Sequence, residues 1–273
     1  MAVSIYHYII FVLFAIFVVV ERLTSARDYP EVRLWRALGL ASTLLYFAIT
    51  TCAPFLWDAW LSGHRLIDAT GLPFVVQVVA GFLLLELGIY GWHRAMHRSD
   101  VIWRAHQMHH AAERVDIWGA FYFHPLDMIG WALLGSLCLV GIVGLTPEAT
   151  LAVNVLATFC SMFQHANIRT PRWIGYVVAR PESHAIHHER GVHAFNYGDI
   201  PLWDMVFGTF RNPASWDGKA GFDAGSTGTR ECWSGRRWLE LPDQPFMHWK
   251  ASGRGISLQF QSAFSYLAGR SRR

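Results

Sequence analysis

The fold and the chemistry are decided by a stretch that carries three histidine boxes: His93-Arg94-Ala95-Met96-His97, His106-Gln107-Met108-His109-His110 and His184-Ala185-Ile186-His187-His188. Eleven of the chain's 14 histidines lie between His93 and His193. Residues i, i+3 and i+4 share one face of an α-helix, so each box, if helical, directs two or three imidazoles the same way. Neutral imidazole binds iron, zinc, copper or nickel. Eight histidines exceed the needs of one ion, so the boxes predict a two-metal site.

A structural explanation competes with this one. A lone histidine on an apolar face is usually a hydrogen-bonded core residue, and we interpret His7, His64 and His248 in that way. Three boxes close together would need three unrelated structural reasons to coincide. The set therefore favours metal binding, while each box alone would not.

The composition is that of an integral membrane protein. The 273 residues are 53% hydrophobic and 16% charged, with 13 Trp and 18 Phe, whereas soluble domains carry about 25% charged residues. The net charge is only +3 and there is no basic run with interleaved aromatics, so a nucleic-acid partner is not expected. None of the four cysteines forms a CxxC pair, which disfavours a disulfide framework or a zinc ribbon.

Apolar runs predict an all-α membrane bundle of about three spans followed by a helical hairpin. The predicted spans are 5–20, 37–56 and 72–92. Arginines gather in links 22–36 and 94–104, which the positive-inside rule places in the cytoplasm together with the histidine boxes. Runs 129–143 and 149–163, joined at Thr146-Pro147, predict a hairpin that either spans the membrane or re-enters on the same side.

The apolar runs and the histidine boxes divide the chain into three expected regions. Residues 1–92 form a transmembrane scaffold, residues 93–211 a catalytic cap that includes hairpin 129–163, and residues 212–273 a cytoplasmic tail. His165 follows the hairpin and so returns to the side of the first two boxes.

Two other metal-site classes do not fit the spacing. A bundle di-iron carboxylate site needs Glu-x-x-His repeats, and no glutamate of this chain has a histidine three residues later. A zincin needs HExxH, whereas His188-Glu189 is followed by His193, one residue too far along the chain.

In order and spacing, HRAMH, HQMHH and HAIHH resemble the fatty acid hydroxylase and sterol desaturase superfamily. Asn196-Tyr197-Gly198 and the run from Trp203-Asp204 to Thr209 agree with it, and the similarity covers about residues 83–211. The resemblance implies a membrane-embedded all-α fold, two iron ions held mostly by histidine, and O2-dependent hydroxylation or desaturation of a lipid. The ligands that it implies are His93, His97, His106, His109, His110, His165, His184, His187 and His188. His124, in Phe123-His124-Pro125, is either a further ligand or a residue that shapes the cavity.

Three polar residues are candidates to assist the metal ligands. Histidine ligands need outer partners to fix their tautomers. Glu182 and Asn196 flank the third box, and Glu86 lies at membrane depth, where an acidic residue is costly and usually functional. Glu86 would act beside the ligands or in a substrate channel, or simply reach interfacial water.

The proposed reaction needs two electrons, and the chain shows no flavin, haem or iron–sulfur motif. We therefore expect an external donor of the ferredoxin or cytochrome type, with its reductase. The basic residues expected to meet this donor are Arg94, Arg98, Arg104, Arg169, Arg172, Arg180, Arg236 and Arg237.

A membrane metal-binding or metal-transport protein is the alternative to a lipid oxygenase. A transporter should place polar groups through several spans. In this chain the spans are mostly apolar and the histidines cluster at one face, which favours the enzyme. The sequence does not name the lipid.

Overall fold

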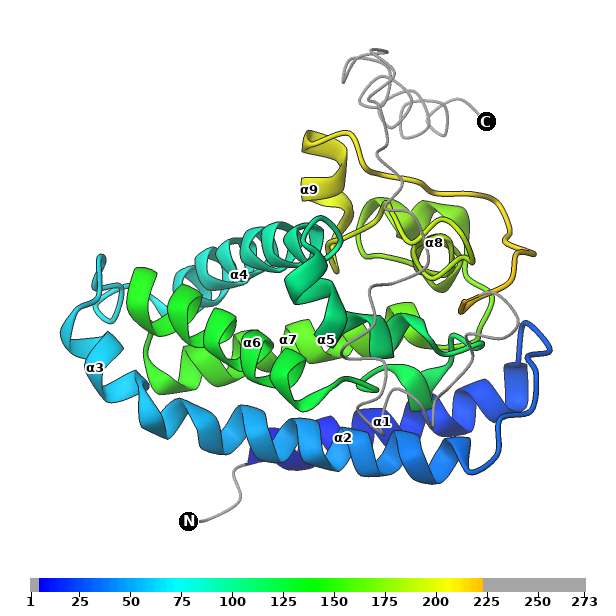
Figure 1. The fold of residues 1–273 in the computed structure, drawn as a ribbon. Helices are drawn as coiled ribbons and strands as arrows, with labels where there is room; N and C mark the ends of the chain where they lie inside the picture. The colour runs from blue at the N-terminus through cyan, green and yellow to red at the C-terminus, as the bar shows by residue number, and fades with distance from the viewer. Residues whose placement is uncertain (1–4, 223–273) are drawn as a thin grey trace, which may run out of the picture.

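The computed structural model describes residues 5–222, and their regular structure is helical (Figure 1). The longer helices are α1 (Ile5–Thr24), α2 (Trp35–Cys52), α4 (Phe74–Met96), α5 (Asp100–His110), α6 (Pro125–Ser136) and α7 (Pro147–His165). The shorter elements are η1 (Ala53–Leu56), α3 (Asp58–Gly63), η2 (Ile117–Gly119), the π-helix η3 (Leu137–Ile142), η4 (Arg172–Tyr176), α8 (Pro181–His187) and α9 (Pro201–Val206). Within residues 5–222 there is no strand, only an isolated bridge between Glu189 and Ala220. The predicted all-α fold is confirmed.

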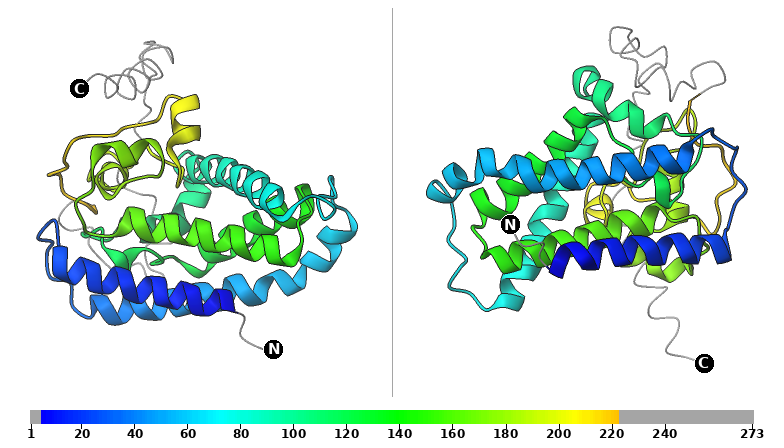
Figure 2. Two further views of the ribbon diagram at one scale, coloured as in Figure 1. Left: turned by 180° about the vertical axis from the view of Figure 1, so that it is seen from behind. Right: turned by 90° about the horizontal axis from the view of Figure 1, so that it is seen from below.

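The long helices run side by side in layers (Figures 1 and 2). α1 packs on α7 and α2 packs on α6, while α4 contacts α6 and α7 from the other side. α4 leads into α5, and α7 contacts α8 near the same end of the bundle. The three histidine boxes and His165 are therefore gathered at one end of the helical layers.

Three helices of the described part are long and apolar enough to cross a membrane: Trp35–Leu56, Phe74–Met96 and Pro125–Ile142. The first two coincide with predicted spans 37–56 and 72–92. The third is the first arm of the hairpin, which is longer than predicted because its helix starts at Pro125. The predicted span 5–20 lies in α1, outside these three, so its crossing stays a prediction. The cytoplasmic orientation also stays a prediction, and most of the expected tail 212–273 lies outside the described residues.

The hairpin turn forms as its sequence predicts. Thr146 caps α7, its Oγ1 accepting from the Ala149 N–H at 3.3 Å, and Pro147 takes the first helical position. Gln77 of α4 is buried and accepts from the Thr146 N–H at 2.9 Å, so this polar residue of a predicted span ties the turn to α4. Gly81 allows the close approach, since a Cβ there would lie 2.5 Å from Leu145 Cδ1.

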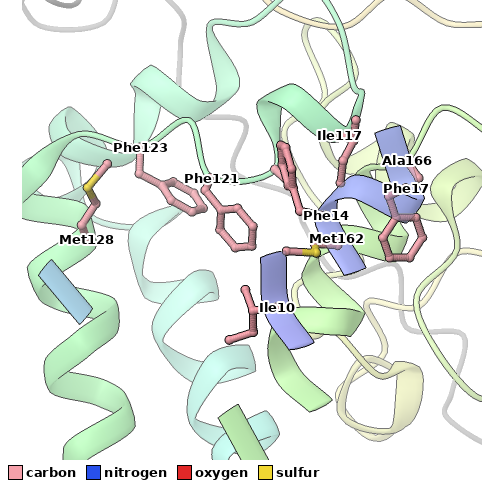
Figure 3. Close-up of a cluster of buried hydrophobic side chains, with 10 residues drawn as sticks. Ile10, Phe14, Phe17, Ile117, Phe121, Phe123, Met128, Met162 and Ala166 are labelled. Carbon is pink, nitrogen blue, oxygen red and sulfur yellow. The ribbon is translucent and has the colours of Figure 1, made fainter. Parts of the chain in front are cut away.

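An apolar cluster fixes the loop between α5 and α6 (Figure 3). Ile10, Phe14 and Phe17 of α1 are buried in the same cluster as Phe121 of that loop and Met162 of α7. Burying a side chain of this size stabilises the fold by about 1.5–3 kcal/mol. Since Met162 lies one turn before His165, the cluster also sets the position of that histidine.

Candidate metal centre

The structure gathers nine histidines into two buried clusters. The five-histidine cluster consists of His93, His97, His106, His110 and His187, and the four-histidine cluster consists of His109, His165, His184 and His188. Within each cluster one nitrogen from every ring lies within 4.8 Å of the others. No ring of either cluster is more than 8% exposed, so little water reaches the nitrogen atoms. These are the nine histidines that the resemblance implied as ligands, and their role as ligands stays a prediction.

Each HxxHH box contributes to both clusters. In α5, His106 and His110 are four residues apart and enter the five-histidine cluster, while His109 enters the other. At α8 the division is reversed: His184 and the following His188 enter the four-histidine cluster, and His187 enters the five-histidine cluster. On this face the i+3 and i+4 side chains lie about 100° apart around the helix axis, so they can enter neighbouring clusters. Two helices facing each other thus place the two clusters side by side.

In the five-histidine cluster, ring nitrogens that carry lone pairs and no proton point toward one another. His187 Nδ1 donates to the Phe195 carbonyl and His93 Nδ1 donates to the Tyr197 carbonyl, each at 2.8 Å. A carbonyl only accepts, so in the neutral rings the proton is on Nδ1 and Nε2 is bare. Yet the two Nε2 atoms lie 2.9 Å apart. Two unprotonated nitrogens at this distance need a cation between them, which a bound metal ion supplies.

A proton shared between the rings is a poorer explanation of these short nitrogen–nitrogen distances than a metal ion. Burial, followed by the charge of neighbouring imidazoles, lowers the pKa of five of the clustered histidines well below the usual value. These are His109, His110, His184, His187 and His188. The neutral form is the one that binds a metal, so the residues present fit a metal ion in each cluster.

The spacing of the nitrogens also fits metal coordination. In the five-histidine cluster, His106 Nε2 lies 3.1 Å from both His93 Nε2 and His110 Nε2. In the four-histidine cluster, His184 Nε2 lies 3.0 Å from both His165 Nε2 and His188 Nε2. Two nitrogens bonded to one ion at about 2.1 Å lie about 3.0 Å apart at a right angle and about 3.4 Å apart at a tetrahedral angle. These separations are compatible with nitrogens that bind one shared ion.

Outer partners fix the orientation of several rings. Asp127, at the start of α6, is fully buried, and its Oδ2 lies 2.8 Å from His106 Nδ1. A carboxylate in this place fixes the tautomer and makes the ligand more basic. His193 Nδ1 lies 3.2 Å from His110 Nδ1, and His165 Nδ1 donates to the Ser161 carbonyl at 2.7 Å. Sequence reasoning gave no role to His193. Carbonyl partners leave no signature in the sequence.

The three polar residues expected to assist catalysis lie close to the clusters, but each binds backbone. Glu86 is fully buried and accepts from the Ile200 N–H at 3.1 Å. Glu182 accepts from the Thr170 N–H at 2.9 Å, and Asn196 donates to the Ser183 carbonyl at 2.7 Å. These contacts hold the third box and the segment after it in place.

Two residues, His124 and Arg180, lie outside the sites in which the sequence placed them: the metal cluster and the donor-binding surface. His124 is outside both clusters; its Nδ1 accepts from the Leu126 N–H at 3.1 Å, which caps α6. This position agrees with the alternative in which Phe123-His124-Pro125 shapes the surroundings. Arg180 is fully buried, because its Nε donates to Glu182 and its Nη2 to the Pro213 carbonyl. It therefore cannot belong to a surface for an electron donor, and Arg236 and Arg237 lie outside the described residues.

Asp204 organises the segment that follows the third box. Its carboxylate accepts from the N–H groups of Tyr197 and Gly198, at 2.9 and 2.8 Å, and from the Thr209 hydroxyl at 2.6 Å. Burial is the main reason that the pKa of Asp204 is raised to about 6. A Cβ on Gly198 would lie 2.9 Å from the Ile200 carbonyl oxygen, so close packing explains this glycine. Residues 196–209, which include the motifs that resemble the superfamily, thus form a compact hydrogen-bonded segment around Asp204.

The structure thus combines an all-α bundle that has membrane-length helices with two clusters of buried histidines that could hold metal ions. Comparison with known proteins supports the family resemblance. Residues 78–209 match the fatty acid hydroxylase family model, which confirms the resemblance seen in the boxes.

The relatives are similar over only part of their length. The chain is 30% identical over 158 residues to the ornithine lipid hydroxylase of Rhizobium tropici, which is 56% of this chain and 47% of that protein. It is 28% identical to human lathosterol oxidase, over 64% of this chain and 60% of the relative. It is 29% identical to human alkylglycerol monooxygenase, over 48% of this chain and 30% of the relative. The match thus spans less than two thirds of each of these relatives. No solved structure matches the chain.

Proposed function

We propose that this chain is a membrane oxygenase that uses O2 and two iron ions to hydroxylate or desaturate a C–H bond of a lipid. The observation that carries the proposal is the pair of bare Nε2 atoms of His93 and His187, buried and 2.9 Å apart. The activities named for the relatives, which are hydroxylation, oxidation and monooxygenation of lipids, support the reaction class.

The protein supplies binding, orientation and exclusion of water. When bound, the irons provide the oxidising power that an unactivated C–H bond requires and that side-chain acid–base chemistry lacks. Five histidines would hold one ion and four the other. Because the rings are buried, the centre stays dry and unproductive side reactions with water are suppressed. Asp127 orients His106, while Glu182 and Asn196 hold the third box and Glu86 holds the segment at Ile200.

The partners follow from the same scheme. A lipid substrate reaches the centre from the membrane, and residues 93–211 form the catalytic region on the cytoplasmic side. Two electrons come from a ferredoxin- or cytochrome-type donor with its reductase. Arg98, Arg169 and Arg172 are exposed and can meet an acidic donor, and Arg94 and Arg104 are half-buried. Such charge pairing mainly raises the association rate.

The test uses the full chain, purified, loaded with iron and reconstituted in vesicles of extracted lipids with a reduced ferredoxin. We expect O2-dependent conversion of a lipid, read by mass spectrometry. Isotope-labelled O2 separates the two outcomes, because hydroxylation places the label in the lipid and desaturation only removes two hydrogens. A His184→Ala chain is the matched control. An unchanged lipid pool together with metal uptake into the vesicles would overturn the oxygenase and support the transport alternative.

A further inference from the structure

The segment that follows the third box, residues 191–197, has an unusual backbone. Gly191, His193, Phe195 and Asn196 all have positive φ, at 74°, 39°, 69° and 46°. Three of these are not glycine, and such residues rarely adopt this conformation unless their surroundings impose it. Asn196 anchors the segment, since its side chain donates to the Ser183 carbonyl of α8 and its N–H donates to the Thr209 carbonyl.

This backbone places three acceptors against ligand rings. The Phe195 carbonyl accepts from His187 Nδ1 and the Tyr197 carbonyl accepts from His93 Nδ1, both at 2.8 Å. The third contact is the His193 ring, whose Nδ1 lies 3.2 Å from His110 Nδ1. All three rings belong to the five-histidine cluster.

His193 is itself held in place by aromatic neighbours. Its ring centroid lies 5.1 Å from that of Phe222 and 6.0 Å from that of Trp103. His110 directs Nε2 at the cluster, toward His106 Nε2, so its neutral ring carries the proton on Nδ1. His193 Nδ1 is then the acceptor for that proton.

The four-histidine cluster is less well supported. His165 Nδ1 donates to the Ser161 carbonyl. The Nδ1 atoms of His109, His184 and His188 are buried and have no hydrogen-bond partner in the described part of the chain. A ring whose second nitrogen has no partner is not fixed in tautomer or orientation.

We propose that His193 is a positioning residue that fixes His110. Segment 191–197 then makes the metal position inside the five-histidine cluster (the five-histidine position) bind its ion more tightly than the position inside the four-histidine cluster (the four-histidine position). The four-histidine position then releases its ion first. The inference rests on the proposed two-metal function, and it concerns which residues secure each ion rather than the reaction itself.

The experiment follows metal release from the full chain, loaded with two irons in detergent, after addition of a chelator. We expect two phases. His188→Ala should abolish the early phase and leave the late one, which assigns the phases to the clusters. His193→Ala should accelerate the late phase about 10- to 100-fold, the usual cost of losing an outer partner, with the early phase unchanged. Mössbauer spectra should show that only one of two iron sites is altered. His64→Ala, an exposed histidine of the α3 region, is the control and should match the wild type.

Two further variants keep the test decisive if His193→Ala fails to fold. Asn and Asp both tolerate positive φ and both offer an oxygen acceptor to His110. His193→Asn should restore the late phase to near the wild-type rate, and His193→Asp should slow it, because a carboxylate partner strengthens a histidine ligand. A single phase in the wild type, or equal acceleration of both phases in His193→Ala, would overturn the inference. So would a His193→Asp chain that releases its late ion as fast as the wild type or faster. A wild type that binds no iron would overturn the proposed function instead.

Discussion

The two histidine clusters are built from the same helices but supported in different ways. In the five-histidine cluster, the rings of His93, His106, His110 and His187 each have an outer partner, and one of these partners is the buried carboxylate of Asp127. In the four-histidine cluster, the partner of His165 is a carbonyl of its own helix. The HxxHH spacing therefore decides which cluster each ring enters, while support comes from segments that the boxes do not contain.

The largest effect should come from removing one ligand of either cluster. Because the proposed reaction needs both ions, His106→Ala and His188→Ala should each lower lipid turnover by at least about 100-fold, despite the different support of the two clusters. The measurement is turnover of the reconstituted chain with saturating donor. If His188→Ala kept half of the wild-type rate, the four-histidine cluster would be dispensable for the chemistry.

A smaller effect should come from Asp127→Asn. The amide keeps the shape of the side chain but loses the charge that makes His106 a stronger ligand, so affinity at the five-histidine position should fall about 10- to 100-fold. Competition with a metal-binding dye measures it. Asp68→Asn, at an exposed pair with Arg65, is the matched control. Equal weakening of both positions would show that the support is shared rather than confined to one cluster.

The smallest effect that we expect is a fall in the stability of the metal-free chain as the pH decreases. Burial lowers the pKa of clustered histidines such as His109 and His187, so the unfolded chain takes up protons near pH 6.5 while the folded chain does not. Stability should therefore fall as the pH drops from about 7.5 to about 5.5, by up to about 1.4 kcal/mol per pH unit for each such histidine. Asp199 and Asp204, whose pKa burial raises to about 6, act in the opposite sense and reduce this slope between about pH 4 and 6.

Thermal unfolding in detergent checks this dependence. His64→Ala should leave it unchanged, since His64 is exposed and not in the core as its sequence context predicted. His188→Ala and His187→Ala should each flatten it. A flattening by His187→Ala alone would mean that the four-histidine cluster is wetter than its burial indicates.

The sequence predicted the helices and which histidines lie together, for a physical reason. Helical periodicity determines which side chains share a face, so HxxHH and a capped Thr146-Pro147 turn can be interpreted without a structure. The start of the hairpin at Pro125 was missed, because the polar residue Asp127 interrupts the apolar run while serving His106. Asp127 was a candidate partner by its position in the sequence, whereas the carbonyl partners of the rings could not be foreseen, since carbonyls of residues such as Phe195 are placed by the folded backbone.

Charge was misread for a related reason. Arg180 looked like a surface cation, but its guanidinium is buried against Glu182 and a carbonyl. Its partner Glu182 also accepts from the Thr170 hydroxyl. His124 lies outside both clusters and caps α6. These contacts are set by the folded chain around the boxes, so the sequence pattern alone does not predict them.

The most direct test of the account is to count metal ions in variants of two histidines on the same short helix. His184 and His187 are three residues apart in α8, yet they belong to different clusters. Iron analysis of the purified, reconstituted full chain should give two ions per chain for the wild type and one for each of His184→Ala and His187→Ala, with a different spectroscopic site remaining in each. A wild type with fewer than two ions, or the same site lost in both variants, would contradict the two-cluster centre.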